Sequence, residues 1–394
     1  MSFKRIICLL VLIFTICLLT GCWDRVEINE RGFVVGVAID FNKGNDKHKY
    51  EGTYQVIVPA GLKQSNAQSS SMSHGGQAFF NIATTENSMP AVAARMSSRT
   101  SRSPYFEHLK VIIVSSEIAK SKNIFPSMMD FFLRNSEMRR GVQILIADGQ
   151  ASDILNIAPN NEATPVDYIS SIAKNIKKSN YMLPQSRIGD VHEKLIQTES
   201  FVIQTVKKVE DGITLNGAAL FDGVSNQLLG FLNGEETQGL NFITEQVKGG
   251  VLESIFEKET VGFKVEGTKR KFIVEQLSPD HFKFIVKLSA EGVLDKSIAA
   301  GDPSETETLD KLQKSLEELI VKNANKAITR MQHTYKKDAL GMGAFLYQNH
   351  YKIWKPIADN WDQGANIFAK TDIEVQAKVT IRRVGNIFQS SKER

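Results

Sequence analysis

The positions of the cysteines limit what can hold this chain together. The sequence has 394 residues and three cysteines, at Cys8, Cys17 and Cys22. Residues 23–394 therefore contain neither an internal disulfide nor a cysteine-ligated metal. With 42% hydrophobic and 23% charged residues, the composition is globular and excludes a disordered or collagenous chain. The length suits roughly two or three domains.

The charges and histidines argue against several classes of function. Lys and Arg total 48 against 44 acidic residues, so the net charge of +4 gives no strong basic field for DNA or RNA. His192-Glu193 begins like a zinc-binding helix motif, but Ile196 stands where the second histidine belongs. The sequence thus predicts no nucleic acid partner, no metal and no cofactor.

The first segment has the features of a signal peptide. Lys4 and Arg5 precede an apolar run from Ile6 to Leu19 that only Thr15 interrupts. This run is shorter than the roughly 20 residues that a helix needs to cross the hydrocarbon core. We therefore expect residues 1–21 to be removed rather than to remain as a membrane span.

The end of this segment, Leu19-Thr20-Gly21-Cys22, resembles the lipobox of bacterial lipoproteins. The resemblance implies cleavage between Gly21 and Cys22 and acylation of Cys22, for example with palmitate. Several acyl chains would hold the protein stably at a membrane, on its extracytoplasmic face. The alternative is an ordinary secretory signal with a chance cysteine at the cleavage site.

Residues 22–200 alternate between apolar runs typical of strands and segments with helical spacing. The predicted strands are Phe33–Phe41, Tyr50–Val58, Leu109–Val114 and Val142–Ala147. The predicted helices are Thr85–Arg102, Ile118–Arg134 with a break at Pro126, Ala151–Ile157 and Pro165–Ile176. This alternation predicts an N-terminal α/β region of one lobe or two.

Residues 201–394 predict a C-terminal α+β domain. Short strand-like runs from Ile213 to Ala290, separated by turn residues, favour an antiparallel meander. Asp302-Pro303-Ser304-Glu305 is a helix-capping sequence, and a long amphipathic helix follows with its apolar stripe over 309–331. Apolar residues over 373–381 then alternate with polar ones as in a half-buried strand. The predicted fold class is α+β, with several domains of mixed sheets flanked by helices.

Catalytic motifs are missing from the sequence. Gly223-Val224-Ser225-Asn226-Gln227 lacks the last glycine of a nucleophile elbow. Gly341-Met342-Gly343 lacks the third glycine of a dinucleotide loop. Adjacent acids such as Glu235-Glu236 are typical of a solvated face. We therefore expect a protein that is not an enzyme.

Three further residues are candidates for a structural motif. His108 lies just before a predicted buried strand, where it would support the start of that strand. Trp354 and Trp361 are seven residues apart, which on a helix places them two turns apart on one face. Such a pair suits core packing, and the alternative is a partner surface.

Several segments together resemble the Ger(x)C family, the C-subunit lipoproteins of nutrient germinant receptors in endospore-forming bacteria. The resemblance extends over the whole chain and rests on the order of its motifs. They are Gly21-Cys22-Trp23-Asp24, 35–40, 106–114, Asp130-Phe131-Phe132-Leu133-Arg134, Trp354-Lys355-Pro356-Ile357 with Trp361, and Arg383-Val384-Gly385. The sequence departs from the family with a polar insert at Gln348-Asn349-His350-Tyr351.

This resemblance implies a role in spore germination. The implied partners are an A-type polytopic subunit and a B-type membrane subunit, with the lipoprotein on the outer face of the spore inner membrane. It also implies a three-domain structure of sheets and helices without enzymatic activity.

Two other functions remain open from the sequence. A lipid-anchored solute-binding protein of a transporter shares the lipobox but needs two similar α/β lobes around a cleft. A secreted hydrolase would need a nucleophile or metal signature. Neither the nutrient nor the partner surface is encoded in a recognisable motif.

Overall fold

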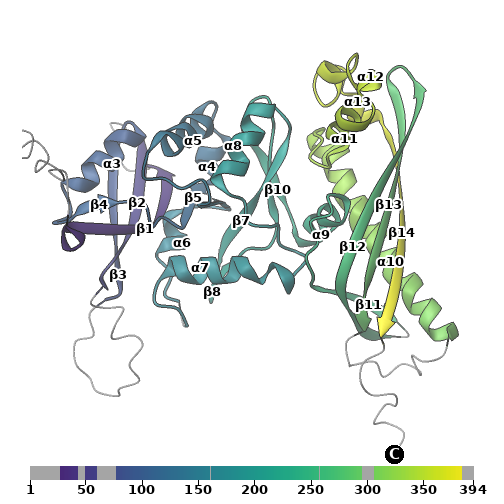
Figure 1. Ribbon diagram of the computed structural model, residues 1–394, viewed down its shortest axis with the longest axis horizontal. Helices are drawn as coiled ribbons and strands as arrows, with labels where there is room; N and C mark the ends of the chain where they lie inside the picture. Colours follow the sequence, from purple (N-terminus) through teal and green to yellow (C-terminus); the bar gives the residue numbers. More distant parts are fainter. Residues whose placement is uncertain are drawn as a thin grey trace, which may run out of the picture.

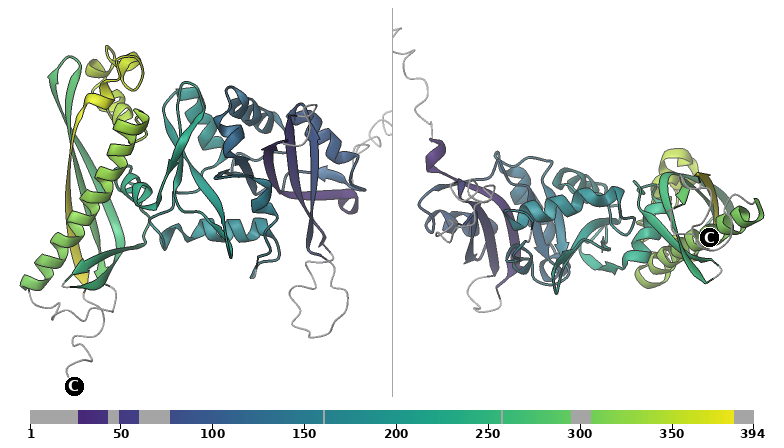
Figure 2. Two further views of the ribbon diagram at one scale, coloured as in Figure 1. Left: turned by 180° about the vertical axis from the view of Figure 1, so that it is seen from behind. Right: turned by 90° about the horizontal axis from the view of Figure 1, so that it is seen from below.

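The computed structural model contains two separate β-sheets joined by a short helix (Figure 1). It describes residues 27–42, 49–59, 77–159, 161–256, 258–294 and 306–383. We call residues 27–232 the N-terminal body and residues 251–383 the C-terminal body. The two bodies lie side by side along the long axis of the molecule (Figures 1 and 2).

The N-terminal body is built on a ten-stranded mixed sheet, counted over the described residues. Its central strands are parallel: β7 (Phe201–Val209), β6 (Gln143–Ala147), β5 (Val111–Ser115) and β1 (Arg31–Phe41). Antiparallel strands flank them: β2 (Tyr50–Ile57) and β3 (Phe79–Glu86) on one side, β9 (Ala218–Phe221) and β10 (Leu228–Leu232) on the other. Short β4 (Ser103–Tyr105) and β8 (Gly212–Thr214) pair with β1 and β7.

Helices cover both faces of this sheet, which explains why its central strands β5 and β6 are almost entirely apolar. All five residues of β5 and of β6 are buried. One core contains side chains of α3 (Met89–Ser97), α4 (Ser116–Lys120), α5 (Ile124–Arg134) and α8 (Ile188–Gln197). The core on the opposite face contains side chains of α6 (Ser152–Leu155) and α7 (Pro165–Ala173).

The predicted helix break at Pro126 is displaced. The chain leaves α4 after Lys120 and begins α5 at Ile124, and Asn123 between them has a left-handed backbone with φ of 62°. Pro126 lies in the first turn of α5, where its missing N–H has no intrahelical acceptor to lose. The break therefore falls before the proline.

The C-terminal body is a four-stranded sheet with helices packed against it (Figure 2). Its strands follow the order β11 (Val251–Phe256), β12 (Glu259–Ser278), β13 (His281–Leu294) and β14 (Asp372–Arg383). The helical segments are α10 (Thr306–Thr329), η3 (Arg330–Tyr335), α11 (Met342–Asn349), α12 (Tyr351–Trp354), η4 (Ala358–Asn360) and α13 (Ile367–Lys370).

The long helix and the last strand agree with the sequence prediction. Leu312, Leu316 and Ile320 of α10 are each at most 1% exposed, and α10 packs against β14 and β11. On β14, Glu374, Gln376 and Lys378 are exposed on one face. Val375 and Ala377, which alternate with them, are partly buried. The predicted α+β class, with mixed sheets, a long amphipathic helix and a final alternating strand, is confirmed.

The predicted single meander is wrong. Its first strands, up to Leu232, belong to the ten-stranded sheet, and 259–278 forms one long strand rather than two. We expected a domain boundary between residues 200 and 201. The first sheet contains strands from both sides of this position, because β7 pairs with β6, which precedes it, and with β9, which follows it. Turn residues mark where strands end, but they do not determine which sheet a strand joins.

Candidate functional site

Two of the predicted site residues, Gly21 and Cys22, lie outside the described residues. His108 is exposed just before β5, and its ring contacts those of Phe33 and Tyr105 at centroid distances of 5.3 and 5.9 Å. These contacts connect the start of β1 and the end of β4 with the loop that precedes β5. The surroundings of His108 are thus aromatic side chains of the sheet edge.

The two predicted tryptophans contact each other across a turn rather than along a single helix. Trp354 ends α12, Trp361 follows η4, and their ring centroids are 5.9 Å apart. Trp361 is 3% exposed in the core of the C-terminal body, and Trp354 packs against that core. The Trp361 indole donates a 2.7 Å hydrogen bond to the Oδ2 atom of Asp338.

Asp338 organises the segment around this tryptophan. Its carboxylate also accepts hydrogen bonds from the backbone N–H groups of residues 340–343, at 2.6 to 3.3 Å. Burial raises the pKa of Asp338, and the donated hydrogen bonds act in the opposite direction. The carboxylate satisfies the free N–H groups at the start of α11 and holds Trp361 against them.

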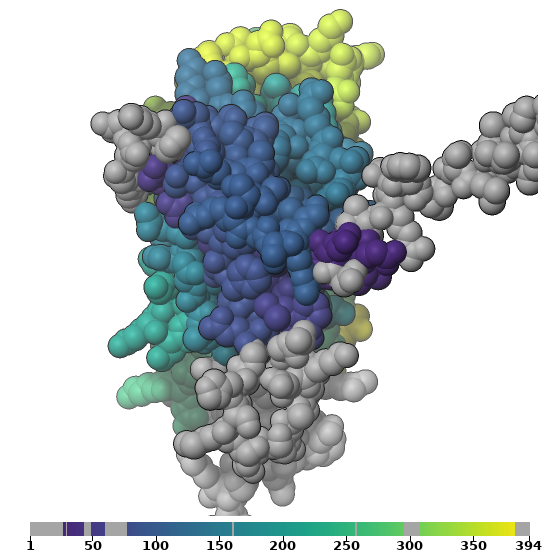
Figure 3. Space-filling view, turned by 90° about the vertical axis from the view of Figure 1, so that its left-hand side faces the viewer, coloured from purple at the N-terminus to yellow at the C-terminus, as the bar shows by residue number. Residues whose placement is uncertain are grey.

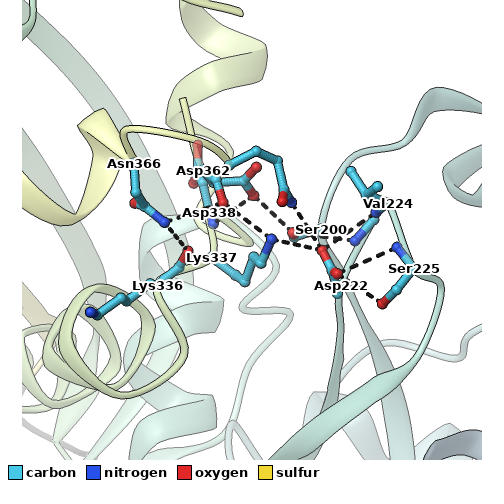
Figure 4. Close-up of polar contacts among 11 residues, drawn as sticks. Ser200, Asp222, Val224, Ser225, Lys336, Lys337, Asp338, Asp362 and Asn366 are labelled. Atoms are coloured by element: carbon cyan, nitrogen blue, oxygen red, sulfur yellow. Dashed lines mark hydrogen bonds and ion pairs between the residues drawn. The ribbon is translucent and has the colours of Figure 1, made fainter. Parts of the chain in front are cut away.

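A polar cluster beside Asp338 joins the two bodies (Figure 4). Asp222, in the turn between β9 and β10, forms an ion pair with Lys337 at 2.8 Å, and both side chains are less than 15% exposed. Gln363 donates to the same Asp222 oxygen at 3.1 Å. Ser200, just before β7, donates a 2.8 Å hydrogen bond to Asp362. We call these five residues the interbody junction.

The junction is held rigidly on each side. Ser225 donates to Asp222 from its hydroxyl at 2.8 Å and from its backbone N–H at 3.3 Å, which fixes the turn. On the other side, Lys337 donates to the backbone oxygen of Asp362 at 3.1 Å. Apolar contacts between the bodies lie beside these polar ones. Leu220 and Leu232 of the N-terminal body belong to the hydrophobic core of the C-terminal body.

The ion pair determines the protonation state of Asp222. Burial alone raises the pKa of this carboxyl group, but hydrogen bonds from Lys337 and Ser225 and the Lys337 charge outweigh it. The pKa of Asp222 therefore lies below its ordinary value of 3.8. Its contribution to stability is fully present above pH 3.8 and is lost as the pH falls through the lowered pKa.

We expect Lys337→Met to lower the free energy of unfolding by about 2 kcal/mol, because it leaves the largely buried Asp222 charge without its cation. Urea unfolding measures this difference, which should be constant from about pH 5 to pH 8 and shrink below the ordinary pKa. The matched control is Lys311→Met, which breaks an exposed i,i+4 pair with Glu307 and should cost at most about 0.5 kcal/mol. Equal effects of the two variants would contradict this view of the junction.

A second contact between the bodies is made by α9 (Gly234–Ile243), whose last seven residues are all buried. Gln238 donates a 2.6 Å hydrogen bond to Asn180 of the N-terminal body and accepts one from Asn323 of α10. Asn241 donates to the backbone oxygens of Asn180 and Met182. Buried amide groups thus fix the orientation of α9 between the two bodies.

Two hollows lie on the N-terminal body, whose end face is shown in Figure 3. One, of about 370 Å³, is lined by Arg95 and Arg99 among hydroxyl side chains. The other, of about 550 Å³, lies between the start of α3 and α5 and includes Phe131 and Arg134. Within the described ranges, no three His, Cys, Asp or Glu side chains gather as metal ligands.

Sequence reasoning missed the interbody junction. Asp222-Gly223 is a sequence typical of a turn, but Lys337, the partner of Asp222, is more than a hundred residues further along the chain. A lysine in a polar segment carries no sign of burial. The α9 segment is unusual because its polar residues Thr237, Gln238 and Asn241 are buried, at helix positions that apolar residues normally occupy.

The fold and the junction define a class: an α+β protein of two bodies that are connected by a partly buried polar cluster. Comparison with protein families identifies that class. The family "Spore germination protein N-terminal domain" matches residues 24–208, and "Spore germination B3/GerAC like, C-terminal" matches residues 216–385. The chain belongs to the Ger(x)C family of spore germination proteins that its sequence resembles.

Relatives in Bacillus subtilis (strain 168) match over almost their full length. Spore germination protein YndF is 28% identical, over 97% of this chain and 96% of the relative. Spore germination protein B3 is 25% identical over 96% and 97%, and spore germination protein A3 is 26% identical over 97% and 98%. The crystal structure of the GerBC protein has a similar fold, with a TM-score of 0.60 at 21% identity, over 88% of this chain and 97% of that one.

Proposed function

We propose that this chain is the lipid-anchored C subunit of a spore germinant receptor and that spores need it to germinate in response to nutrients. Membership in a family of spore germination proteins is the observation that carries this proposal. Its partners are an A-type polytopic subunit and a B-type membrane subunit. The family is not a known enzyme family, and we propose a non-catalytic role in receptor assembly or signal coupling.

The proposed anchor is the acylated Cys22, which becomes the first residue after removal of 1–21. Within the described residues, no helix has both the length and the apolar composition to cross a bilayer. Acyl chains on Cys22 would keep the two bodies on the outer face of the spore inner membrane. Tethering of this kind raises the local concentration of the chain beside its partners.

The interbody junction supports a coupling role. The polar contacts at Asp222 and Lys337, together with α9, connect the first sheet to the second. A contact made by a partner on one body is thereby transmitted to the other. The strand orders of the two sheets differ, which favours this role over a solute-binding protein with two similar lobes.

The test uses spores that depend on this receptor alone. We expect Cys22→Ala to abolish or strongly slow the nutrient-triggered release of dipicolinic acid, as deletion of the chain does, because the protein loses its anchor. Fractionation of the spores measures whether the variant is still processed and membrane-bound. A Cys17→Ala variant, which changes a cysteine inside the signal, is the control and should germinate normally.

Each outcome bears on a different part of the proposal. Normal dipicolinic acid release in the deletion strain would separate this chain from germination, and saturable ligand binding would then favour the solute-binding alternative. Normal processing and membrane retention of Cys22→Ala would disprove the acyl anchor while leaving the receptor role in place.

A further inference from the structure

An aromatic and basic surface on the C-terminal body takes part in neither the core nor the interbody junction. Tyr347 of α11 and Tyr351 of α12 are 56% and 54% exposed, and their rings meet at a centroid distance of 5.7 Å. Lys352 and Lys355 next to them are exposed. We call these four residues the tyrosine–lysine patch.

The opposite side of the same segment is firmly packed. Leu346 is fully buried, and the ring of Phe345 contacts that of Phe272 in β12 at 5.3 Å. Trp354 contacts Trp361 in the core. The patch is therefore held on a rigid support, and its two tyrosines contribute no core packing that would explain them.

The segment that carries the patch contains basic but no acidic side chains. Residues 339–358 contain two lysines and no Asp or Glu. Of the acids that flank this segment, Asp338 is buried and bound to backbone N–H groups, and Asp359 lies beyond it in η4. The segment thus offers two positive charges beside two amphipathic rings.

We propose that the tyrosine–lysine patch binds an anionic lipid surface. Tyrosine is enriched at the membrane–water interface, where its ring contacts apolar groups and its hydroxyl stays hydrated. Lysine is attracted to anionic headgroups but is depleted in protein–protein interfaces. The combination of tyrosine with lysine, without acids, favours a lipid surface over a protein partner.

The position of the patch strengthens the inference. In both views of the fold, α12 lies at the same end of the C-terminal body as the turn of the β12–β13 hairpin (Figures 1 and 2). Leu277, just before that turn, is 56% exposed. The patch belongs to the body that is remote in sequence from Cys22, so it would give the protein a second membrane contact and a fixed orientation.

The experiment measures vesicle binding by the chain from residue 22 onward carrying Cys22→Ser, so that acylation contributes nothing. Sedimentation compares vesicles of pure phosphatidylcholine with vesicles containing phosphatidylglycerol at low salt. We expect binding only to the anionic vesicles. Lys352→Gln/Lys355→Gln should lower the partition coefficient about 30-fold, since each lysine near the surface contributes a factor of about five. Salt should weaken the wild-type binding.

The control pair is Lys174→Gln/Lys178→Gln, which makes the same change of charge at exposed positions of the N-terminal body. It should leave binding nearly unchanged. Tyr347→Ser/Tyr351→Ser should also weaken binding, without loss of thermal stability because both side chains are exposed. Equal effects of the two lysine pairs, or no binding of the wild type to anionic vesicles, would overturn the proposal. Because the test chain is not acylated, its outcome is independent of germination.

Discussion

Asp338→Ala is expected to lower the free energy of unfolding by about 4 kcal/mol. The carboxylate is the acceptor for the N–H groups of residues 340–343 and for the indole of Trp361, and all of these hydrogen bonds except that from Gly341 are buried. Removing a helix cap costs about 1 kcal/mol, and each buried donor left without an acceptor costs about 1 to 3 kcal/mol more. Urea unfolding, with Trp fluorescence as the signal, measures the loss.

Trp361→Phe is the matched variant for this prediction. It removes the indole N–H and keeps an aromatic ring, so we expect a loss of about 1 to 2 kcal/mol, well below that of Asp338→Ala. Far-ultraviolet circular dichroism replaces fluorescence for this variant. A loss below about 1 kcal/mol for Asp338→Ala would show that the segment holds its shape without the carboxylate.

Gly239→Ala is expected to cost about 3 kcal/mol, because α9 and α10 cross in backbone contact at this position. A Cβ atom on Gly239 would lie 2.0 Å from the backbone oxygen of Asn323, and neither atom is on a flexible side chain. The helices must separate, which also strains the hydrogen bond from Asn323 to Gln238. Chemical denaturation provides the measurement.

Gly267→Ala is the control for this steric effect. Gly267 lies in β12 of the same body, and its Cβ would meet nothing within 4 Å. We expect a change within about 0.5 kcal/mol. If both alanine variants were equally stable, the close approach of α9 and α10 would not matter for the fold.

The local structure of this chain was largely readable from sequence. The β5 and β6 strands appear as uninterrupted apolar runs because both of their faces are buried. The α10 helix has its stripe at spacings of three and four, and β14 alternates between two faces. In each case the spacing of apolar residues along the sequence indicates the type of element.

The sequence alone therefore determined many of the elements, the α+β class and the family, although it missed β3 and α9 and divided β12 into two strands. The tertiary structure decided how they combine: which sheet receives β9 and β10, and that Asp222 meets Lys337 across the two bodies. Periodicity reports which face of an element is buried, but not the element that covers it. A buried ion pair and an amide cluster such as Asn180–Gln238–Asn323 look like solvated residues until distant segments come together, because burial is a property of the fold and not of the residue.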